Sequence, residues 1–116
     1  MKESDVILTA MPQADGNVKH RPALILRDMP PFGDMLVCGV STQLHQYVRG
    51  FDEIISPEDT DFASNGLVAA SLIRLGFLAV IPRRTIAGSI GFIAPERQKL
   101  LLKALSIYLV RDIDVS

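Results

Sequence analysis

The sequence predicts a mainly β protein of five to seven short antiparallel strands, followed by one α-helix at the C-terminal end. Up to residue 93, short apolar runs rich in β-branched residues are separated by Gly, Pro and Asp turn signals. No helical pattern alternates with these runs, which argues against a doubly wound α/β fold. The apolar spacing then changes to three and four residues. For 116 residues we expect one domain, residues 1–116, in which the helix packs on a small, strongly bent sheet or barrel.

The first predicted strand is Asp5–Ala10, an apolar run that a Met-Pro pair ends. An Asp-Gly turn signal separates it from the second strand, Arg21–Arg27. Proline donates no ladder hydrogen bond, so Pro22 belongs at the start or the edge of a strand. We therefore expect the second strand to begin at Arg21, at the mouth of the loop.

Four further strands are predicted beyond a Pro- and Gly-rich break at residues 29–34. They are Met35–Thr42, Phe51–Ile55, Ser71–Ile81 and Gly88–Ile93. The long run from residue 71 is too β-branched for a helix, and we expect it to bend at Gly76. The acidic stretch up to Asn65 is interpreted as a loop with at most a helical turn.

The C-terminal segment has the pattern of one amphipathic helix. Pro95 fits the first helical position, Glu96 suits the positive start of a helix, and Arg111 suits the negative end. Apolar residues recur in a single stripe that consists of Leu101, Ala104, Leu105, Tyr108 and Leu109. We expect this stripe to pack on the sheet.

Composition and cysteine content exclude several classes of protein. The chain has 12 Lys and Arg against 13 Asp and Glu, unlike a highly charged disordered protein. One cysteine, Cys38, excludes an internal disulfide, and with two histidines a transition-metal site is not expected. The acidic N-terminus and the short apolar runs match neither a signal peptide nor a membrane span. We expect a soluble cytoplasmic protein with no membrane association, no metal and no cofactor.

Charge is distributed unevenly along the chain. Five acids and no bases lie between Gly50 and Asn65, whereas six bases and one acid lie between Ser71 and Lys103. Such a chain can present a positive face to a polyanion, or its charges can scatter over the surface and pair with one another. The sequence leaves both alternatives open.

Two arginines and two hydroxyls have positions that suit a phosphate site. Arg21 begins the second predicted strand and Arg74 interrupts an apolar one, while Ser41 and Thr42 end the third. A guanidinium binds phosphate as a permanently charged fork, and hydroxyls add neutral donors. RNA supplies its own nucleophile, the 2′-hydroxyl, so a ribonuclease needs only a proton acceptor, a proton donor and stabilisation of the phosphorane. The ordinary alternative is solvated strand residues and a turn or cap.

The order of these segments resembles the MazF/PemK toxin family over nearly the whole chain. The matching segments in the front half are Asp5–Leu8, Asp15–Gly16, Lys19–Ile25 and Gly39–Gln43. Those in the rear half are Ser71–Arg74, Arg84–Ile86, Gly91 and the leucine-rich C-terminal helix. The Arg-Pro-Ala-Leu element at residues 21–24 is the most specific of them.

The resemblance implies an SH3-like barrel of the kind shared with the CcdB toxins, acting as a homodimer. The implied activity is that of a metal-independent endoribonuclease, which cleaves single-stranded mRNA to a 2′,3′-cyclic phosphate and a 5′-hydroxyl. The implied partner is a cognate antitoxin, whose tail would block a groove at the dimer interface. A CcdB-like action on DNA gyrase is less favoured, because the Arg-Pro-Ala-Leu element matches the RNA-cleaving branch.

The same resemblance implies roles for individual residues. Arg21 matches an arginine that stabilises the phosphate and the transition state, and Arg74 matches a proton-donating arginine of the plasmid-borne branch. Ser41 and Thr42 match a Thr-Ser pair in inverted order. Gln43, which follows them, is expected to contact the RNA.

The proton acceptor is where the chain departs from the family. The plasmid-borne branch has an acidic residue two positions after Arg74, and here that position is Gly76, which can neither take nor give a proton. His20 is one candidate base, although on an extended strand Lys19, not His20, shares the side of the neighbouring arginine. Asp15 is the second candidate, and Asp15 and Lys19 are also expected to bind RNA. The alternative is a weakened barrel that binds RNA or an antitoxin-like protein without cleavage.

Overall fold

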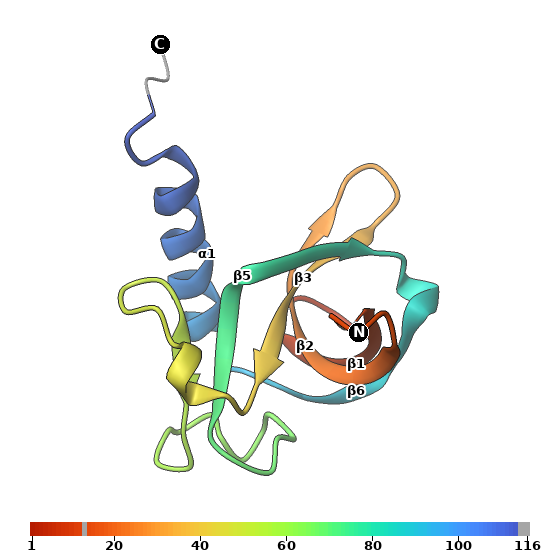
Figure 1. Cartoon of the computed structure of the whole chain (residues 1–116), viewed down its shortest axis with the longest axis horizontal. Helices are drawn as coiled ribbons and strands as arrows, with labels where there is room; N and C mark the ends of the chain where they lie inside the picture. Colours follow the sequence, from red (N-terminus) through yellow and green to blue (C-terminus); the bar gives the residue numbers. More distant parts are fainter. Residues whose placement is uncertain (13, 114–116) are drawn as a thin grey trace.

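The computed structural model describes residues 1–12 and 14–113. Over these residues the chain forms six β-strands, two short 3-10 helices and one α-helix (Figure 1). The elements are β1 (Asp5–Pro12), β2 (Val18–Met29), β3 (Asp34–Ser41), η1 (Leu44–Gln46), β4 (Glu53–Ile55), β5 (Ser71–Ile81), η2 (Arg83–Thr85), β6 (Ile86–Phe92) and α1 (Pro95–Val110). The predicted class, five to seven antiparallel strands followed by a C-terminal helix, is confirmed.

All six strands belong to one antiparallel sheet. Its strand order is β4-β5-β3-β2-β1-β6, and every neighbouring pair is antiparallel. Figure 1 shows the sheet curling strongly, so that β1, β2 and β6 wrap around one another while α1 stands to one side. The strong twist of a small sheet produces this barrel-like shape.

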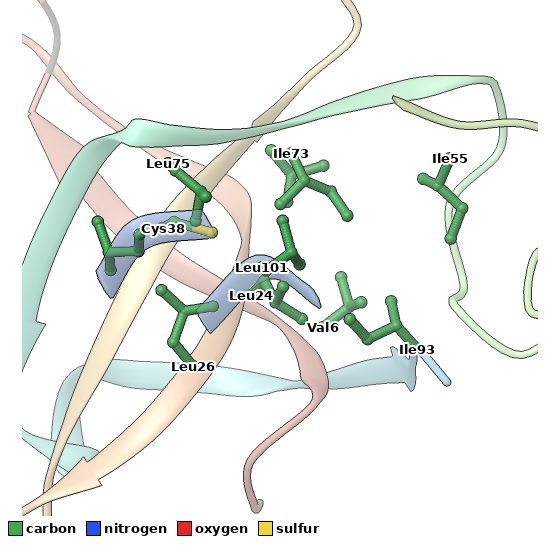
Figure 2. Packing of buried hydrophobic residues seen from close by; sticks show 11 residues of the cluster. Val6, Leu24, Leu26, Cys38, Ile55, Ile73, Leu75, Ile93 and Leu101 are labelled. Carbon is green, nitrogen blue, oxygen red and sulfur yellow. The ribbon is translucent and has the colours of Figure 1, made fainter. Parts of the chain in front are cut away.

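Hydrophobic side chains are buried on both faces of the sheet. On one face, Leu101 and Leu105 of α1 pack with side chains from β1, β2, β3 and β5 (Figure 2). On the other face lies a smaller cluster, which contains Ile7, Ala23, Ile25, Met35 and Val37. Residues 23–26 of β2 alternate between the two clusters and are all fully buried. This strand is therefore fixed from both sides.

β5 bends sharply, as the glycine in its middle predicts. Two successive residues of β3 face Leu78 and Arg74, so the segment Leu75–Phe77 has no partner in β3. Gly76 is the central residue of this bulge, and Figure 1 shows the corner that β5 makes. The bend predicted at Gly76 is confirmed.

β2 begins at Val18 rather than at Arg21, so the predicted start of this strand is wrong. Pro22 lies inside the strand, opposite Leu8 of β1. The pairing of β2 with β3 begins only at Ala23, so one edge of β2 is still open at the proline. Proline fits there because, on an open edge, its missing N–H removes no ladder hydrogen bond.

The other boundaries differ by a few residues. β3 ends at Ser41, β4 begins at Glu53, and β6 begins at Ile86 and ends at Phe92. Residues 56–65 form hydrogen-bonded turns and no helix, and the two 3-10 helices were not predicted.

The apolar stripe of α1 is buried only in its first half. Leu101 and Leu105 are buried, whereas Tyr108 and Leu109 are 52% and 57% exposed. The expectation that the whole stripe packs on the sheet is wrong, because the end of α1 projects beyond the sheet (Figure 1). Among the described residues, no helix is both long and apolar enough to cross a membrane.

One arginine connects α1 to the acidic segment. Arg97 donates to both oxygens of Asp61 at 2.9 and 3.1 Å, to Glu53 at 2.8 Å and to Asp59 at 3.1 Å. The nearly buried Asp61 also accepts the N–H of Ala94 at 3.0 Å. At this place the uneven charges of the sequence pair with one another.

Candidate functional site

A pocket of about 280 Å³ opens where β2, β3 and β5 adjoin. The residues that line it are Ala14, Arg21, Pro22, Gly39, Val40, Ser41, Gln43, Gln46, Arg74 and Phe77. Four of the predicted site residues are among them, namely Arg21, Ser41, Gln43 and Arg74. They come from three separate parts of the sequence.

Strand pairing brings these parts together. Ala23 of β2 faces Gly39 of β3, and Gly39 also faces Arg74 of β5. Arg21 lies two residues before Ala23, and Ser41 two residues after Gly39, so both side chains point to the side of the sheet on which Ala23 is buried. That side carries the smaller cluster rather than α1.

Phe77 and Pro22 give the pocket an apolar wall. The β5 bulge places the ring of Phe77 over Gly39, where a Cβ atom would lie 3.3 Å from the ring Cδ1. A side chain at position 39 would therefore push the ring aside. Gly39 thus helps to set the shape of the pocket.

The pocket is cationic. Arg21 and Arg74 both line it, and no lining residue carries a carboxylate. Over residues 1–12 and 14–113, neither guanidinium takes part in a salt bridge. Two guanidinium groups that no described carboxylate pairs with form a site that suits the oxygens of a phosphodiester. Within the same ranges, no three His, Cys, Asp or Glu side chains gather in a way that could hold a metal ion.

Ser41 presents a hydroxyl that donates to no other group in the described part of the chain. Its Oγ accepts the backbone N–H of Gln43 at 3.0 Å. This bond fixes the oxygen at the end of β3 and leaves the O–H as a donor to a ligand. Thr42, the next residue, is exposed and does not line the pocket.

The structure places His20 and Lys19 outside the pocket lining. Both side chains are exposed on the first part of β2. Because side chains alternate along a strand, His20 points away from the side that Arg21 occupies, and Lys19 shares that side.

Asp15 lies in the loop between β1 and β2. Its carboxylate accepts the backbone N–H and the Nδ2 of Asn17 at 2.9 and 3.1 Å. Its neighbour Ala14 lines the pocket, so this loop reaches the rim.

Gly76, which has no titratable side chain, does not line this pocket. It lines a second groove of about 580 Å³ between β5, the loop around Phe51 and the C-terminal half of α1. Six lining residues of the pocket were not predicted as site residues, and Gln46 and Phe77 are among them. Gln46 lies on η1, and no sequence pattern predicted a helical turn at that place. Phe77 follows the glycine of the bend, which was the available signal.

Comparison with known proteins agrees with this architecture. No curated protein matches the chain. Among solved structures, the Mycobacterium tuberculosis toxin MazF-mt6 is similar, with a TM-score of 0.62 and 23% sequence identity over 95% of this chain and 98% of that chain. This likeness confirms the expected barrel fold. The family model of PemK-like, MazF-like toxins of type II toxin–antitoxin systems matches residues 2–109, so the chain belongs to this toxin family.

Proposed function

We propose that this toxin is an endoribonuclease that cleaves single-stranded RNA in the pocket between β2, β3 and β5. The observation that carries the proposal is the meeting of two guanidinium groups and a fixed hydroxyl in a pocket without carboxylates. Because the RNA 2′-hydroxyl is the nucleophile, the reaction needs no metal ion and no nucleophile from the protein.

In the proposed reaction, the 2′-hydroxyl loses its proton and its oxygen attacks the adjacent phosphorus. The bond from phosphorus to the 5′-oxygen breaks, which leaves a 2′,3′-cyclic phosphate and, once the leaving oxygen takes a proton, a 5′-hydroxyl. Arg21 and the Ser41 hydroxyl stabilise the negative charge on the phosphorane. Arg74 donates the proton that the leaving 5′-oxygen takes, and it regains a proton from solvent.

The base that accepts the 2′-hydroxyl proton comes, in this proposal, from the segment between β1 and Arg21. His20 and Asp15 are its two candidates, because Gly76 has no titratable group. Separate His20→Ala and Asp15→Asn variants decide between them, since only loss of the true base removes the rise of the rate with pH on the acidic side of the pH–rate profile.

The proposed substrate is single-stranded because its bases must be free to enter the pocket. Phe77 offers an aromatic face, and Gln43 and Gln46 offer amide donors and acceptors for the edges of a base. Lys19 adds positive charge on the Arg21 side of β2 for neighbouring phosphates.

We propose that the toxin works as a cytoplasmic homodimer and is inhibited by a cognate antitoxin. The support is the apolar C-terminal half of α1, where Ile107, Tyr108, Leu109 and Val110 are each more than half exposed beside the second groove. Burying such a surface favours association. Light scattering should give twice the chain mass, and a monomer at micromolar concentration would contradict the dimer.

The cleavage assay uses unstructured RNA in the presence of EDTA. Arg21→Ala should lower the rate about 100- to 1,000-fold, as the loss of one preorganised donor does. Arg27→Ala is the matched control, because Arg27 lies on the same strand, is exposed and pairs with Glu3 away from the pocket. Intact RNA with folded wild-type protein, or equal rates for Arg21→Ala and wild type, would refute the proposal.

The alternative is a toxin-like barrel that binds RNA or an antitoxin-like protein without cleavage. The feature in its favour is Gly76, which has no titratable side chain at the position where the resemblance implies an acid. It predicts RNA binding that weakens steeply with salt, no turnover, and no effect of expression on host growth.

A further inference from the structure

A buried carboxylate, Asp52, does not line the pocket and has no role in the proposed reaction so far. The residue is 6% exposed and stands just before β4. Its Oδ1 accepts the backbone N–H of Leu75 at 3.0 Å, and its Oδ2 accepts the backbone N–H of Val48 at 3.0 Å. The N–H of Asp52 donates in turn to the carbonyl of Val48 at 2.9 Å. One side chain thus joins two separate segments.

Leu75 and Val48 line the second groove, and each lies within two residues of a side chain that lines a different wall of the pocket. Leu75 opens the β5 bulge and directly follows Arg74. Val48 lies two residues after Gln46, which lines the pocket from η1. The bulge leaves Leu75 without a partner in β3, and Asp52 supplies an acceptor for its N–H.

A carboxylate suits this place better than an amide does. An ionised carboxylate only accepts hydrogen bonds, and both oxygens of Asp52 face N–H donors, whereas asparagine would turn an NH₂ group toward one of them. Hydrogen bonds to a charged acceptor are also about twice as strong as neutral ones. Because Asp52 is buried and does not line the pocket, it is not placed to take a proton from RNA.

We propose that Asp52 is a positioning residue, which holds Arg74 and the η1 wall in the geometry that cleavage needs. This inference rests on the proposed function, in which Arg74 donates to the leaving oxygen. A displacement of about 1 Å at a reacting centre can cost about 100-fold in rate. Loss of Asp52 therefore acts on kcat much more than on KM.

Asp52→Asn and Asp61→Asn form a matched pair of variants. Asp61 is 7% exposed and accepts a backbone N–H, as Asp52 does, but it belongs to the Arg97 cluster and not to the pocket. Once folding is verified by circular dichroism, Asp52→Asn should lower kcat about 100-fold with little change in KM. Asp61→Asn should lose stability and keep kcat. Wild-type kcat in Asp52→Asn, or an equal loss in Asp61→Asn, overturns the proposal.

A second variant covers the case in which Asp52→Asn does not fold. Leucic acid incorporated at position 75 turns the N–H of Leu75 into an ester oxygen and removes one hydrogen bond to Asp52. The same fall in kcat supports the positioning role, and an unchanged kcat overturns it.

Amide exchange, measured by NMR, tests the inference without activity. If Asp52 holds both walls, Asp52→Asn accelerates exchange at Gln46 and at Arg74, the ester variant accelerates it at Arg74, and Asp61→Asn changes neither. Unchanged exchange at either residue in Asp52→Asn overturns the inference. RNA left intact by the wild type refutes the proposed function instead, and the exchange result then decides alone whether Asp52 joins the two walls.

Discussion

Replacing Arg97 with methionine tests whether one ion cluster holds α1 to the acidic segment. Methionine keeps part of the apolar stem but removes all four hydrogen bonds that the guanidinium donates. The side chains of Arg97 and Asp61 are 16% and 7% exposed. The substitution therefore leaves the carboxylate of Asp61 buried, with the N–H of Ala94 as its remaining donor.

The size of the expected loss in stability follows from the burial of Asp61. Removing one partner of a buried ion pair costs about 3–5 kcal/mol, because the other charge is left uncompensated. Glu53 and Asp59 are 25% and 35% exposed and can regain water, so the lower end applies. We expect Arg97→Met to lower the free energy of unfolding at neutral pH by about 3 kcal/mol and Tm by roughly 10 °C.

The pH dependence of this loss has a definite sign. Burial by itself raises the pKa of Asp61, but hydrogen bonds from Arg97 and from the Ala94 N–H, with the charge of Arg97, lower it below its ordinary value of 3.8. A carboxyl with a lowered folded pKa contributes stability above its unfolded pKa and loses that contribution as the pH falls through the folded pKa. The gap between wild type and Arg97→Met should be full at neutral pH and should close progressively below about pH 4.

Urea unfolding followed by circular dichroism measures this gap at neutral pH and at several acidic pH values. The double variant Arg97→Met/Asp61→Asn is the control. It also removes the uncompensated charge of Asp61 and should recover part of the lost free energy of unfolding. A loss below about 1 kcal/mol, which is typical of surface pairs, would refute the reasoning. A gap that does not change with pH would refute it equally.

Two further predictions concern the core. Burial, together with the negative charge of Asp52, raises the pKa of the Cys38 thiol to about 12. A thiol reagent at neutral pH should therefore react with Cys38 only after unfolding. Prompt reaction of the folded protein would contradict this prediction. Gly91→Ala should lower the free energy of unfolding by about 1–3 kcal/mol, because the new Cβ would collide with the carbonyl oxygen of Ser64. Gly88→Ala, where the added Cβ meets open space, should leave it nearly unchanged in the same urea titration, and equal losses would count against the argument.

The strands were predictable because each one carries a local signal. β1, β3 and β5 are apolar and β-branched over most of their length, and the glycine that interrupts β5 marks its bend. The start of β2 was not predictable from Pro22, since the cost of a proline depends on whether a neighbouring strand is present at that residue. That neighbour is set by the register of β2 with β3, which is tertiary information.

The site was predictable by residue type and only partly by position. Arg21, Ser41 and Arg74 meet because β3 lies between β2 and β5, and the sequence indicated strands at all three places. Phe77 enters the pocket only because of the bulge in β5. The bulge places three residues between the partners of two successive residues of β3. The length of a bulge depends on packing on both faces of the sheet, so no local pattern encodes it.

The uneven charge of the sequence has a structural consequence for the pocket. Of the five acids between Gly50 and Asn65, four accept hydrogen bonds inside the fold; these four are Asp52, Glu53, Asp59 and Asp61. None of the five lines the pocket, although β4 pairs directly with the part of β5 that leads to Arg74. Carboxylates held by backbone N–H groups and by Arg97 are not free to pair with Arg74. Glu53, Asp59 and Asp61 are held by Arg97, and Asp52 by backbone N–H groups, so the guanidinium groups of the pocket keep the positive potential that a phosphodiester requires.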